Sequence, residues 1–368
     1  MNLKFQDEIE MNQAKVLFVD DEVGVLRSLK RGLRLRRRDW EIQFHQSPLQ
    51  ALDQLDQFSP WIVVSDKRMS EMDGLDFLAQ VRERLPEAVR ILLSGDTSGE
   101  SALGATEVSH LLLAKPFDID DLIEILERTY CLYSLPVSAK SRQVLGDIKT
   151  LPVLPEVYQC LVDYLRSTDQ PDVKKIAEII SRDTAILSKV LQVSNSSFFG
   201  FSSPAQSIQE AVVRLGNDLL SQMVLSIGLF EESELDQQAH RALLAQSEKI
   251  SEKMLTMARF ADVPKQILDK LYITGLLHNV GALAPEIDDP DISHIIGAYL
   301  LKLWGFETEL VNAVLYQNDN EYIDESLLLP FLRVALALDD EKGVTDTLNF
   351  LPESDLRHTK VQAFLQQI

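Results

Sequence analysis

The sequence predicts two domains of different class, a doubly wound α/β domain with five parallel strands followed by an all-α-helical domain. Residues 15–133 alternate short apolar runs with helical patterns, which is typical of a parallel sheet covered by helices. Beyond that point the strand-like runs disappear. Apolar residues then recur at intervals of three and four, as they do at Ile176, Ile179 and Ile180, and this spacing predicts helices.

The change of pattern also predicts the domain boundaries. A chain of 368 residues can bury two or three separate cores. We expect an N-terminal tail over 1–13, the α/β domain over 14–133, a linker over 134–143 and the helical domain over 144–368.

Five strands are predicted, at 15–19, 41–45, 61–65, 90–94 and 110–114. Three of them contain continuous apolar runs, at 16–19, 61–64 and 111–114. Such runs are expected of strands that helices cover on both faces of a sheet.

Composition narrows the class of protein. The net charge is -21, which creates a field that repels phosphate backbones, so we expect no nucleic-acid partner. No apolar run approaches the roughly 18 residues of a membrane span, and the polar, acidic first twelve residues are unlike a secretory signal. We therefore expect a cytoplasmic protein without membrane contact.

A basic run between residues 27 and 38 stands out against this acidic background. Its members are Arg27, Lys30, Arg31, Arg34, Arg36, Arg37 and Arg38. We interpret them as the solvated face and end of a helix, where cations complement the helix dipole. The alternative is a docking patch.

Charged and hydroxyl side chains gather where the predicted strands end. Asp20 and Asp21 follow the first strand, Asp66 follows the third, Ser94 ends the fourth and Lys115 follows the fifth. In doubly wound sheets, ligands bind just beyond these carboxyl ends. Neighbouring carboxylates repel by about 4 kcal/mol per close pair, so the cluster needs a cation, and oxygen ligands suit Mg²⁺. A carboxylate beside Mg²⁺ can attack phosphorus and form an acyl phosphate.

These residues carry a resemblance to a known family. The matching segments are Asp20-Asp21, Asp66 with Met69 and Asp73-Gly74, Leu93-Ser94-Gly95, and Lys115-Pro116-Phe117. Through them, residues 15–130 resemble a response regulator receiver domain.

The resemblance implies a role for each site residue. Asp66 would be the phosphoacceptor, with Ser94 and Lys115 contacting the phosphoryl group. The implied Mg²⁺ ligands are Asp21, Asp66, the backbone carbonyl of Arg68 and, through water, Asp20. The resemblance also implies a cis peptide bond before Pro116.

Two positions depart from the family pattern. Ser70 stands where the family usually has proline. Leu112 stands where a rotating aromatic side chain often transmits phosphorylation to the far face, so the mode of transmission in this chain is open.

The second half resembles the HDOD domain, a helical relative of the HD phosphohydrolases. The resemblance covers most of 144–320. Its carrying segments are 151–155, 179–183, 193–200, 208–216, 275–281 and 297–304.

The metal ligands of a catalytic HD site are incomplete in this half. His278 is retained, but Asn279 replaces the aspartate, and Tyr316 and Gln317 stand where relatives often carry two histidines. Because a neutral amide is a weak metal ligand, we expect no metal or other cofactor here, and a pseudo-enzyme. We interpret His278 as a hydrogen-bonded core histidine and Asn195 as a structural turn residue.

Together the resemblances imply a phosphorylation-controlled regulator. A sensor histidine kinase would phosphorylate Asp66, and the output domain would bind another signalling protein, with a cyclic-dinucleotide enzyme as one candidate and a homodimer left open. Self-phosphorylation would be the chain's own chemistry. The alternatives are a metal-dependent cyclic-dinucleotide phosphodiesterase, which the missing ligands disfavour, and a transcription regulator, which needs a basic recognition helix.

Overall fold

The computed structural model describes residues 14–95, 105, 108–135, 137–148, 151, 153–168, 171–195, 204–227, 237–284, 292–319 and 321–339. The chain forms two compact units. Of the described residues, those within 14–148 and 302–305 form the first unit, and the others form the second. The predicted tail over 1–13 lies outside the described residues. The predicted domain boundaries stay predictions, and segment 134–148 groups with the first unit.

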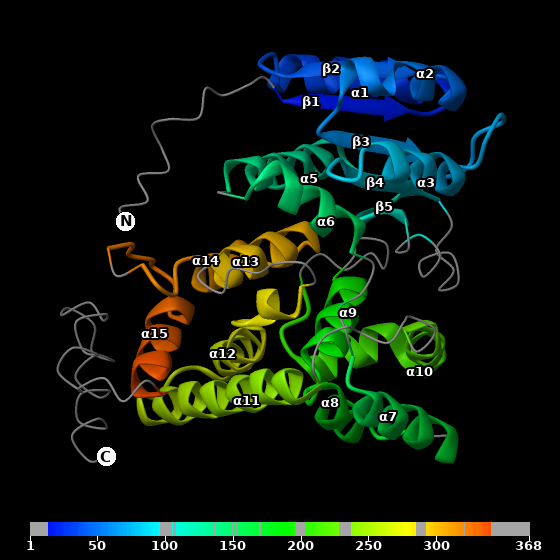
Figure 1. Cartoon of the computed structure of the whole chain (residues 1–368). Coiled ribbons are helices and arrows are strands. Elements are labelled where there is room, and N and C mark those ends of the chain that lie inside the picture. The colour runs from blue at the N-terminus through cyan, green and yellow to red at the C-terminus, as the bar shows by residue number, and fades with distance from the viewer. Residues whose placement is uncertain are drawn as a thin grey trace. The chain divides into compact units, whose positions relative to one another are not determined.

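The first unit contains a five-stranded, all-parallel sheet in the order β2-β1-β3-β4-β5 (Figure 1). Its strands are β1 (Lys15–Val19), β2 (Glu41–His45), β3 (Ile62–Asp66), β4 (Val89–Ser94) and β5 (Leu111–Ala114). The first two have the predicted bounds, and the others differ by one residue. Asp66 therefore ends β3 instead of following it, because its backbone still pairs with Leu93 of β4.

The described helices of this unit are α1 (Val23–Arg36), α2 (Pro48–Phe58), α3 (Gly74–Arg84), α5 (Ile119–Tyr130), the 3-10 helix η1 (Cys131–Ser134) and α6 (Ala139–Asp147). Helices α1, α2, α3 and α5 contact the strands of the sheet. Helix α2 packs against α3, and α1 packs against α5. Side chains define where α2 and α3 begin, since the Ser47 hydroxyl accepts from the Gln50 N–H and the Asp73 carboxylate from the Leu75 N–H.

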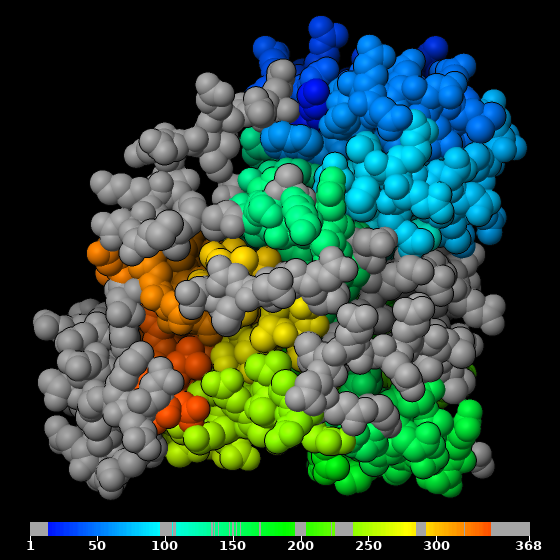
Figure 2. Space-filling model, in the orientation of Figure 1, coloured from blue at the N-terminus to red at the C-terminus, as the bar shows by residue number. Residues whose placement is uncertain are grey.

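Alternation along the strands builds a core on each side of the sheet. Leu17 and Val19 of β1 join a buried cluster with Leu55 of α2 and Phe77 of α3. Phe18, between them, stacks on Phe44 of β2 with ring centroids 5.2 Å apart. On the face shown in Figure 2, the blue and cyan side chains of this unit pack closely together. All residues of β3 and β4 are buried, which accounts for their apolar runs.

The basic run lies on α1 and just after it, and part of it is structural. Arg36 pairs with Asp120, and the Arg37 Nη1 atom lies 2.7 Å from the Glu127 carboxylate, so both tie α1 to α5. The Arg37 guanidinium also lies over the Trp40 ring, 4.3 Å from its centroid. The other five members are exposed.

The second unit is helical, and its described residues contain no strand. Its elements are α7 (Pro155–Ser167), α8 (Val173–Ile180), α9 (Thr184–Ser194), α10 (Ile208–Ile227), α11 (Gln237–Phe260), α12 (Lys265–Leu277), η3 (Val280–Leu283), α13 (Ser293–Leu303), α14 (Thr308–Leu315) and α15 (Leu328–Asp339). Helix α11 packs along α12 and α15, and α10 packs on α9, α8 and α7. Of the helices in the described ranges, none is both long and apolar enough to cross a bilayer.

Candidate functional site

The carboxyl ends of the parallel strands bring the predicted site residues to one edge of the sheet. Asp20 directly follows β1, Asp66 is the last residue of β3, Ser94 is the last of β4 and Lys115 directly follows β5. Asp20 and Ser94 are each only 1% exposed, and Asp66 is 8% exposed. The edge therefore holds ionisable groups that are largely removed from water.

Lys115 joins two of these carboxylates. Its Nζ atom lies 2.9 Å from Asp20 Oδ2 and 2.5 Å from Asp66 Oδ1. Burial lowers the pKa of Lys115, but hydrogen bonds and charge attraction from Asp66 and Asp20 outweigh it, so the pKa is raised overall. The ammonium group is thus held in its charged form between the two acids.

Backbone N–H groups fix the remaining carboxylate oxygens. Asp66 Oδ2 accepts from the Arg68 N–H at 2.8 Å, and Asp20 Oδ1 accepts from the Glu22 N–H at 2.9 Å. Asp21 Oδ2 accepts from the Ser70 N–H at 2.7 Å, which ties the loop after β1 to the loop after β3. Ser70 can donate this bond because it stands in place of a proline, which has no N–H.

Gly74 permits the close approach of α3 to the end of β3. Its N–H donates to the Lys67 carbonyl at 2.7 Å, and a Cβ at this position would lie 2.0 Å from the Asp66 carbonyl oxygen. A larger residue would displace the segment that carries Asp66. The Asp73-Gly74 pair was a motif in the sequence, but this steric role was not evident from it.

Two further expectations concern the fifth strand. The peptide bond between Lys115 and Pro116 is cis, as the resemblance implied. Leu112 is 6% exposed and belongs to the core cluster beside Leu92. An aliphatic side chain therefore occupies the position where an aromatic switch was in question.

The oxygen donors at this edge fit a hard cation, although the described residues hold no group of three or more His, Cys, Asp or Glu side chains arranged as a metal site. Lys115 neutralises Asp20 and Asp66 here. Asp21 is half-buried, and its Oδ2 accepts a single backbone N–H. A carboxylate has about four lone-pair sites, so acceptor capacity remains for an ion.

In the second unit, His278 is a buried histidine with a backbone partner. It is 3% exposed, and its Nδ1 atom lies 2.7 Å from the Gly275 carbonyl oxygen. Burial lowers its pKa to about 4, although the Gly275 carbonyl and the charge of Asp339 raise it. The ring is therefore neutral at physiological pH, as expected of a core histidine.

Asn279 uses both ends of its amide to hold α11. Its Oδ1 atom accepts from the Ser247 hydroxyl at 2.7 Å, and its Nδ2 atom donates to the Leu243 carbonyl at 2.9 Å. An aspartate could not make the second bond, because it has no donor. The amide is thus suited to this contact.

Tyr316 and Gln317 also have structural partners. The Tyr316 ring stacks on the Tyr322 ring, and Gln317 Nε2 donates to the His278 carbonyl at 3.1 Å. Arg333 of α15 donates to the carbonyls of Tyr316, Asp319 and Tyr322 and so fixes this turn.

Asp183 and Asn195 hold the two ends of α9. Asp183, which is fully buried, accepts from the N–H groups of Ala185, Ile186 and Leu154, and so links α9 to the segment before α7. Burial raises its pKa to about 6, although these three N–H groups lower it. Asn195 Oδ1 accepts from the Ala205 N–H at 2.7 Å, a structural role as expected. The buried acceptor role of Asp183 was not predicted.

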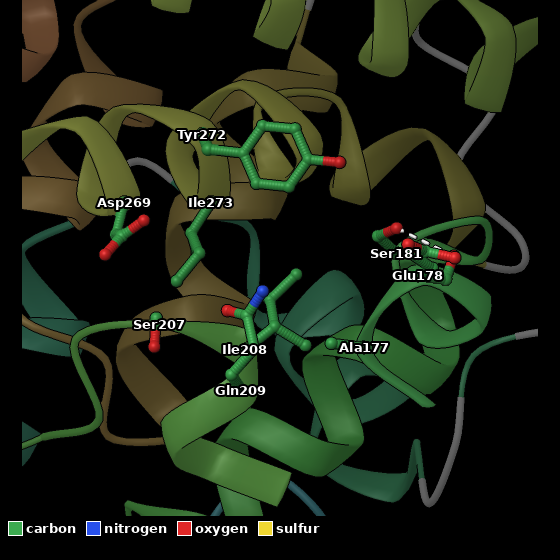
Figure 3. Close-up of a pocket in the computed structure, with 9 residues that line it drawn as sticks. All are labelled: Ala177, Glu178, Ser181, Ser207, Ile208, Gln209, Asp269, Tyr272 and Ile273. Carbon is green, nitrogen blue, oxygen red and sulfur yellow. Dashed lines mark hydrogen bonds between the residues drawn. The ribbon is translucent and has the colours of Figure 1, made fainter. Parts of the chain in front are cut away.

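A cavity of about 120 Å³ opens on the second unit (Figure 3). Its lining comes from α8, the start of α10 and α12. The Glu178 and Asp269 side chains lie on opposite sides of it, with Ile208 and Ile273 between them. Burial raises the pKa of Asp269, although the charge of Lys265 lowers it. None of the predicted site residues lines this cavity.

Comparison with protein families finds one matching domain in each part of the chain. Residues 16–127 match the response regulator receiver domain, and residues 151–287 match the HDOD domain. The α/β unit with its strand-end site and the helical unit agree with these two matches.

Curated relatives share part of the chain. Identity is 33% over 115 residues to the transcriptional regulatory protein GlrR of Escherichia coli K12, covering 31% of this chain and 26% of that protein. It is 31% over 139 residues to the hydrogenase transcriptional regulatory protein HoxA of Bradyrhizobium diazoefficiens, covering 37% and 28%. An uncharacterized protein of Treponema pallidum is 25% identical over 200 residues, covering 47% and 39%. The chain thus spans no more than 39% of the length of these relatives.

Solved structures resemble parts of the chain. The signal receiver domain of an HD domain-containing protein from Pseudomonas fluorescens Pf-5 is 27% identical, with 32% of this chain and 94% of that chain covered and a TM-score of 0.30. The MmoQ response regulator from Methylococcus capsulatus Bath is 20% identical, with 58% and 92% covered and a TM-score of 0.44.

Proposed function

We propose that this chain is a phosphorylation-controlled signalling regulator, because it contains a response regulator receiver domain and an HDOD domain. The receiver accepts a phosphoryl group on Asp66, and the HDOD domain acts by binding another protein. The observation that carries the proposal is the Lys115 ammonium group placed between Asp20 and Asp66 at the ends of the parallel strands.

The chemistry is transfer of a phosphoryl group to a carboxylate. An Asp66 oxygen forms a bond to phosphorus as the phosphorus–nitrogen bond of a kinase phosphohistidine breaks, and the histidine leaves with a proton. Lys115 then exchanges its contact with Asp66 for one with a phosphoryl oxygen, and the Ser94 hydroxyl donates to another. Both groups lie at the carboxyl ends of neighbouring strands, β4 and β5, in the same sheet as Asp66.

Mg²⁺ is part of this proposal. Its ligands would be Asp21, Asp66 and the Arg68 carbonyl, with Asp20 acting through water. The ion would supply positive charge against the transferred oxygens.

Intact-mass measurement after incubation with acetyl phosphate and Mg²⁺ tests the phosphoacceptor. We expect one addition of about 80 Da, the mass of one phosphoryl group on a carboxylate. Asp66→Asn should prevent it, whereas the control Asp53→Asn, at an exposed position of α2, should be labelled like the parent. Labelling of Asp66→Asn at the parental rate would disprove the assignment.

The proposed partners follow from the two domains. A sensor histidine kinase supplies the phosphoryl group, and a downstream signalling protein receives the output, with a cyclic-dinucleotide enzyme as the first candidate to test. Pull-down with the beryllofluoride-loaded and unloaded protein should recover that partner in different amounts. A homodimer is the second assembly to test, by light scattering in both states.

The HDOD domain is proposed to bind without hydrolysing. The support is the engagement of Asn279, Gln317 and His278 in internal hydrogen bonds, since one neutral histidine cannot hold an ion that must also activate water. Purified protein should not hydrolyse cyclic dinucleotides with Mg²⁺, Mn²⁺ or Fe²⁺. Turnover that His278→Ala abolishes would support a phosphodiesterase instead.

Transcription regulation is the second candidate, because GlrR and HoxA are named as transcriptional regulatory proteins. The net charge of -21 opposes it. Gel-shift assays with genomic fragments at physiological salt should show no complex, with or without beryllofluoride.

A further inference from the structure

The segment that follows α5 is fixed to the receiver at the edge opposite the phosphoacceptor. The Tyr133 ring stacks on Trp61, which precedes β3, with centroids 4.5 Å apart, and its hydroxyl donates to the Trp61 carbonyl at 2.7 Å. Arg142 of α6 donates to the carbonyls of Tyr133 and Leu135 at 3.2 and 3.1 Å. Leu145 of α6 is fully buried. Helix α6 therefore packs as part of the first unit.

Arg90 anchors the carboxyl end of α6. Its Nη2 atom donates to the Gly146 carbonyl at 2.6 Å, and its Nη1 and Nε atoms donate to three receiver carbonyls, those of Pro86, Ala88 and Val108. The side chain is 2% exposed. A helix leaves its last carbonyls without intrahelical partners, and a cation placed there also complements the helix dipole.

His110 donates to the same carbonyl oxygen. Its Nδ1 atom accepts the Arg90 backbone N–H at 3.0 Å, so the ring hydrogen is on Nε2, which lies 3.1 Å from the Gly146 oxygen. Burial and then the charge of Arg90 lower the pKa of His110 well below its ordinary value, although the Gly146 carbonyl raises it. The ring is neutral and keeps this orientation.

Gly146 brings the helix end close enough for both bonds. A Cβ at this position would lie 2.1 Å from the Pro86 carbonyl oxygen, so no other residue fits without displacing α6. We refer to Arg90, His110 and Gly146 as the α6 clamp.

The α6 clamp and the phosphoacceptor site share two neighbouring strands. Strand β4 carries Arg90 near its start and Ser94 at its end, while His110 directly precedes β5 and Lys115 directly follows it. At about 3.3 Å per residue, Arg90 lies roughly 13 Å from Ser94, and His110 lies roughly 16 Å from Lys115. Because β4 and β5 are hydrogen bonded in register along this length, a displacement at one end reaches the other.

We infer that the α6 clamp transmits phosphorylation of Asp66 to the chain beyond the receiver, through β4 and β5 to α6, in place of an aromatic switch at Leu112. This inference rests on the proposed function. Contact of Ser94 and Lys115 with the phosphoryl group draws the ends of both strands toward Asp66. The shift lengthens the bonds from Arg90 and His110 to Gly146 and loosens α6.

Hydrogen exchange of the full chain, with and without Mg²⁺ and beryllofluoride, tests this inference over residues 139–148. We expect exchange there to become about tenfold faster on loading, which corresponds to losing one charge-assisted hydrogen bond. Gly146→Ala should show fast exchange in both states, so the difference disappears, while acetyl phosphate still labels Asp66. Gly24→Ala is the matched control, because a Cβ at Gly24 meets nothing within 4 Å, and it should behave like the parent.

A second variant covers the case in which Gly146→Ala fails to fold. His110→Asn retains an acceptor for the Arg90 N–H at the position of Nδ1 and removes the ring Nε2–H that reaches Gly146, so the difference between states should shrink. If the parent is labelled on Asp66 but exchange over 139–148 stays unchanged or becomes slower on loading, the inference is wrong. It is also wrong if either variant shows the same difference in exchange between the loaded and unloaded states as the parent. Failure of the proposed function differs, because Asp66 would then take no label at all.

Discussion

At the scale of single residues, the Lys115 ammonium group neutralises the negative charges of Asp20 and Asp66. Both acids are buried, so removing the ammonium group leaves two carboxylates that repel by a few kcal/mol at an effective dielectric near 20. We therefore expect Lys115→Ala to lower the thermal unfolding midpoint without Mg²⁺. Added Mg²⁺ should raise that midpoint more in the variant than in the parent.

Thermal unfolding at several Mg²⁺ concentrations measures this difference. Lys30→Ala, on the exposed face of α1, is the control and should respond to Mg²⁺ as the parent does. An equal Mg²⁺ response in Lys115→Ala would show that the ion does not compensate for the lost ammonium group.

Two buried groups of the second unit titrate in opposite directions. His278 has a folded pKa of about 4 against an ordinary value of 6.5, so its contribution to stability is present above pH 6.5 and lost as the pH falls through 4. Asp183 has a folded pKa of about 6 against 3.8, so its contribution is present below pH 3.8 and lost as the pH rises through 6. Each contribution is about 3 kcal/mol, at about 1.4 kcal/mol per pKa unit.

These two contributions oppose each other between pH 4 and 6. His278→Gln lacks the histidine contribution, so its stability relative to the parent should fall as the pH rises through this range. Asp183→Asn lacks the aspartate contribution, so its stability relative to the parent should rise instead. Urea unfolding followed by far-ultraviolet circular dichroism at pH 4, 5 and 6 measures both slopes, and parallel curves for the two variants would refute the assignment.

At the scale of elements, α15 holds the turn between α14 and itself through a single side chain. Arg333 is 5% exposed and donates to three backbone carbonyls. The compact ammonium group of a lysine cannot reach all three carbonyls at once, as the wide guanidinium group does. Arg333→Lys should therefore lower the free energy of unfolding by roughly 2 to 3 kcal/mol. Denaturant unfolding provides the measurement.

Arg241→Lys, in α11, is the matched control for this substitution. Arg241 pairs with Glu156 at an exposed site, where ion pairs contribute little to stability. If the two substitutions had equal effects, the turn would not depend on the guanidinium group of Arg333.

At the scale of the whole molecule, the two compact units should unfold in two transitions. Under the proposed function, Mg²⁺ with beryllofluoride binds only the folded receiver and should raise the midpoint of one transition, by an amount equivalent to about 2.7 kcal/mol at a hundredfold excess over Kd. Asp66→Asn should remove the shift. Differential scanning calorimetry measures this, and equal shifts of both transitions would mean that the units unfold as one body.

Local patterns were enough to predict the two classes of architecture. Apolar runs such as 61–64 predict buried strands because covered strands need apolar residues on both faces, and all five strands were located to within one residue. The strand-end cluster was predictable for a related reason, since parallel topology brings the ends of β1, β3, β4 and β5 to one edge whatever the loops do. Resemblance then supplied the expected roles of Asp66 and Lys115.

Tertiary structure decided which partners these side chains have. Lys115 meets Asp20 across 95 positions of sequence, and Arg90 meets Gly146 across 56. No periodicity encodes such pairs, because each depends on how whole elements pack and on the absence of a Cβ at one position. The buried acceptor role of Asp183 is of the same kind. Hydrophobic periodicity is a local property that the sequence carries by itself, whereas hydrogen bonds to buried carbonyls exist only once the core has excluded water around them.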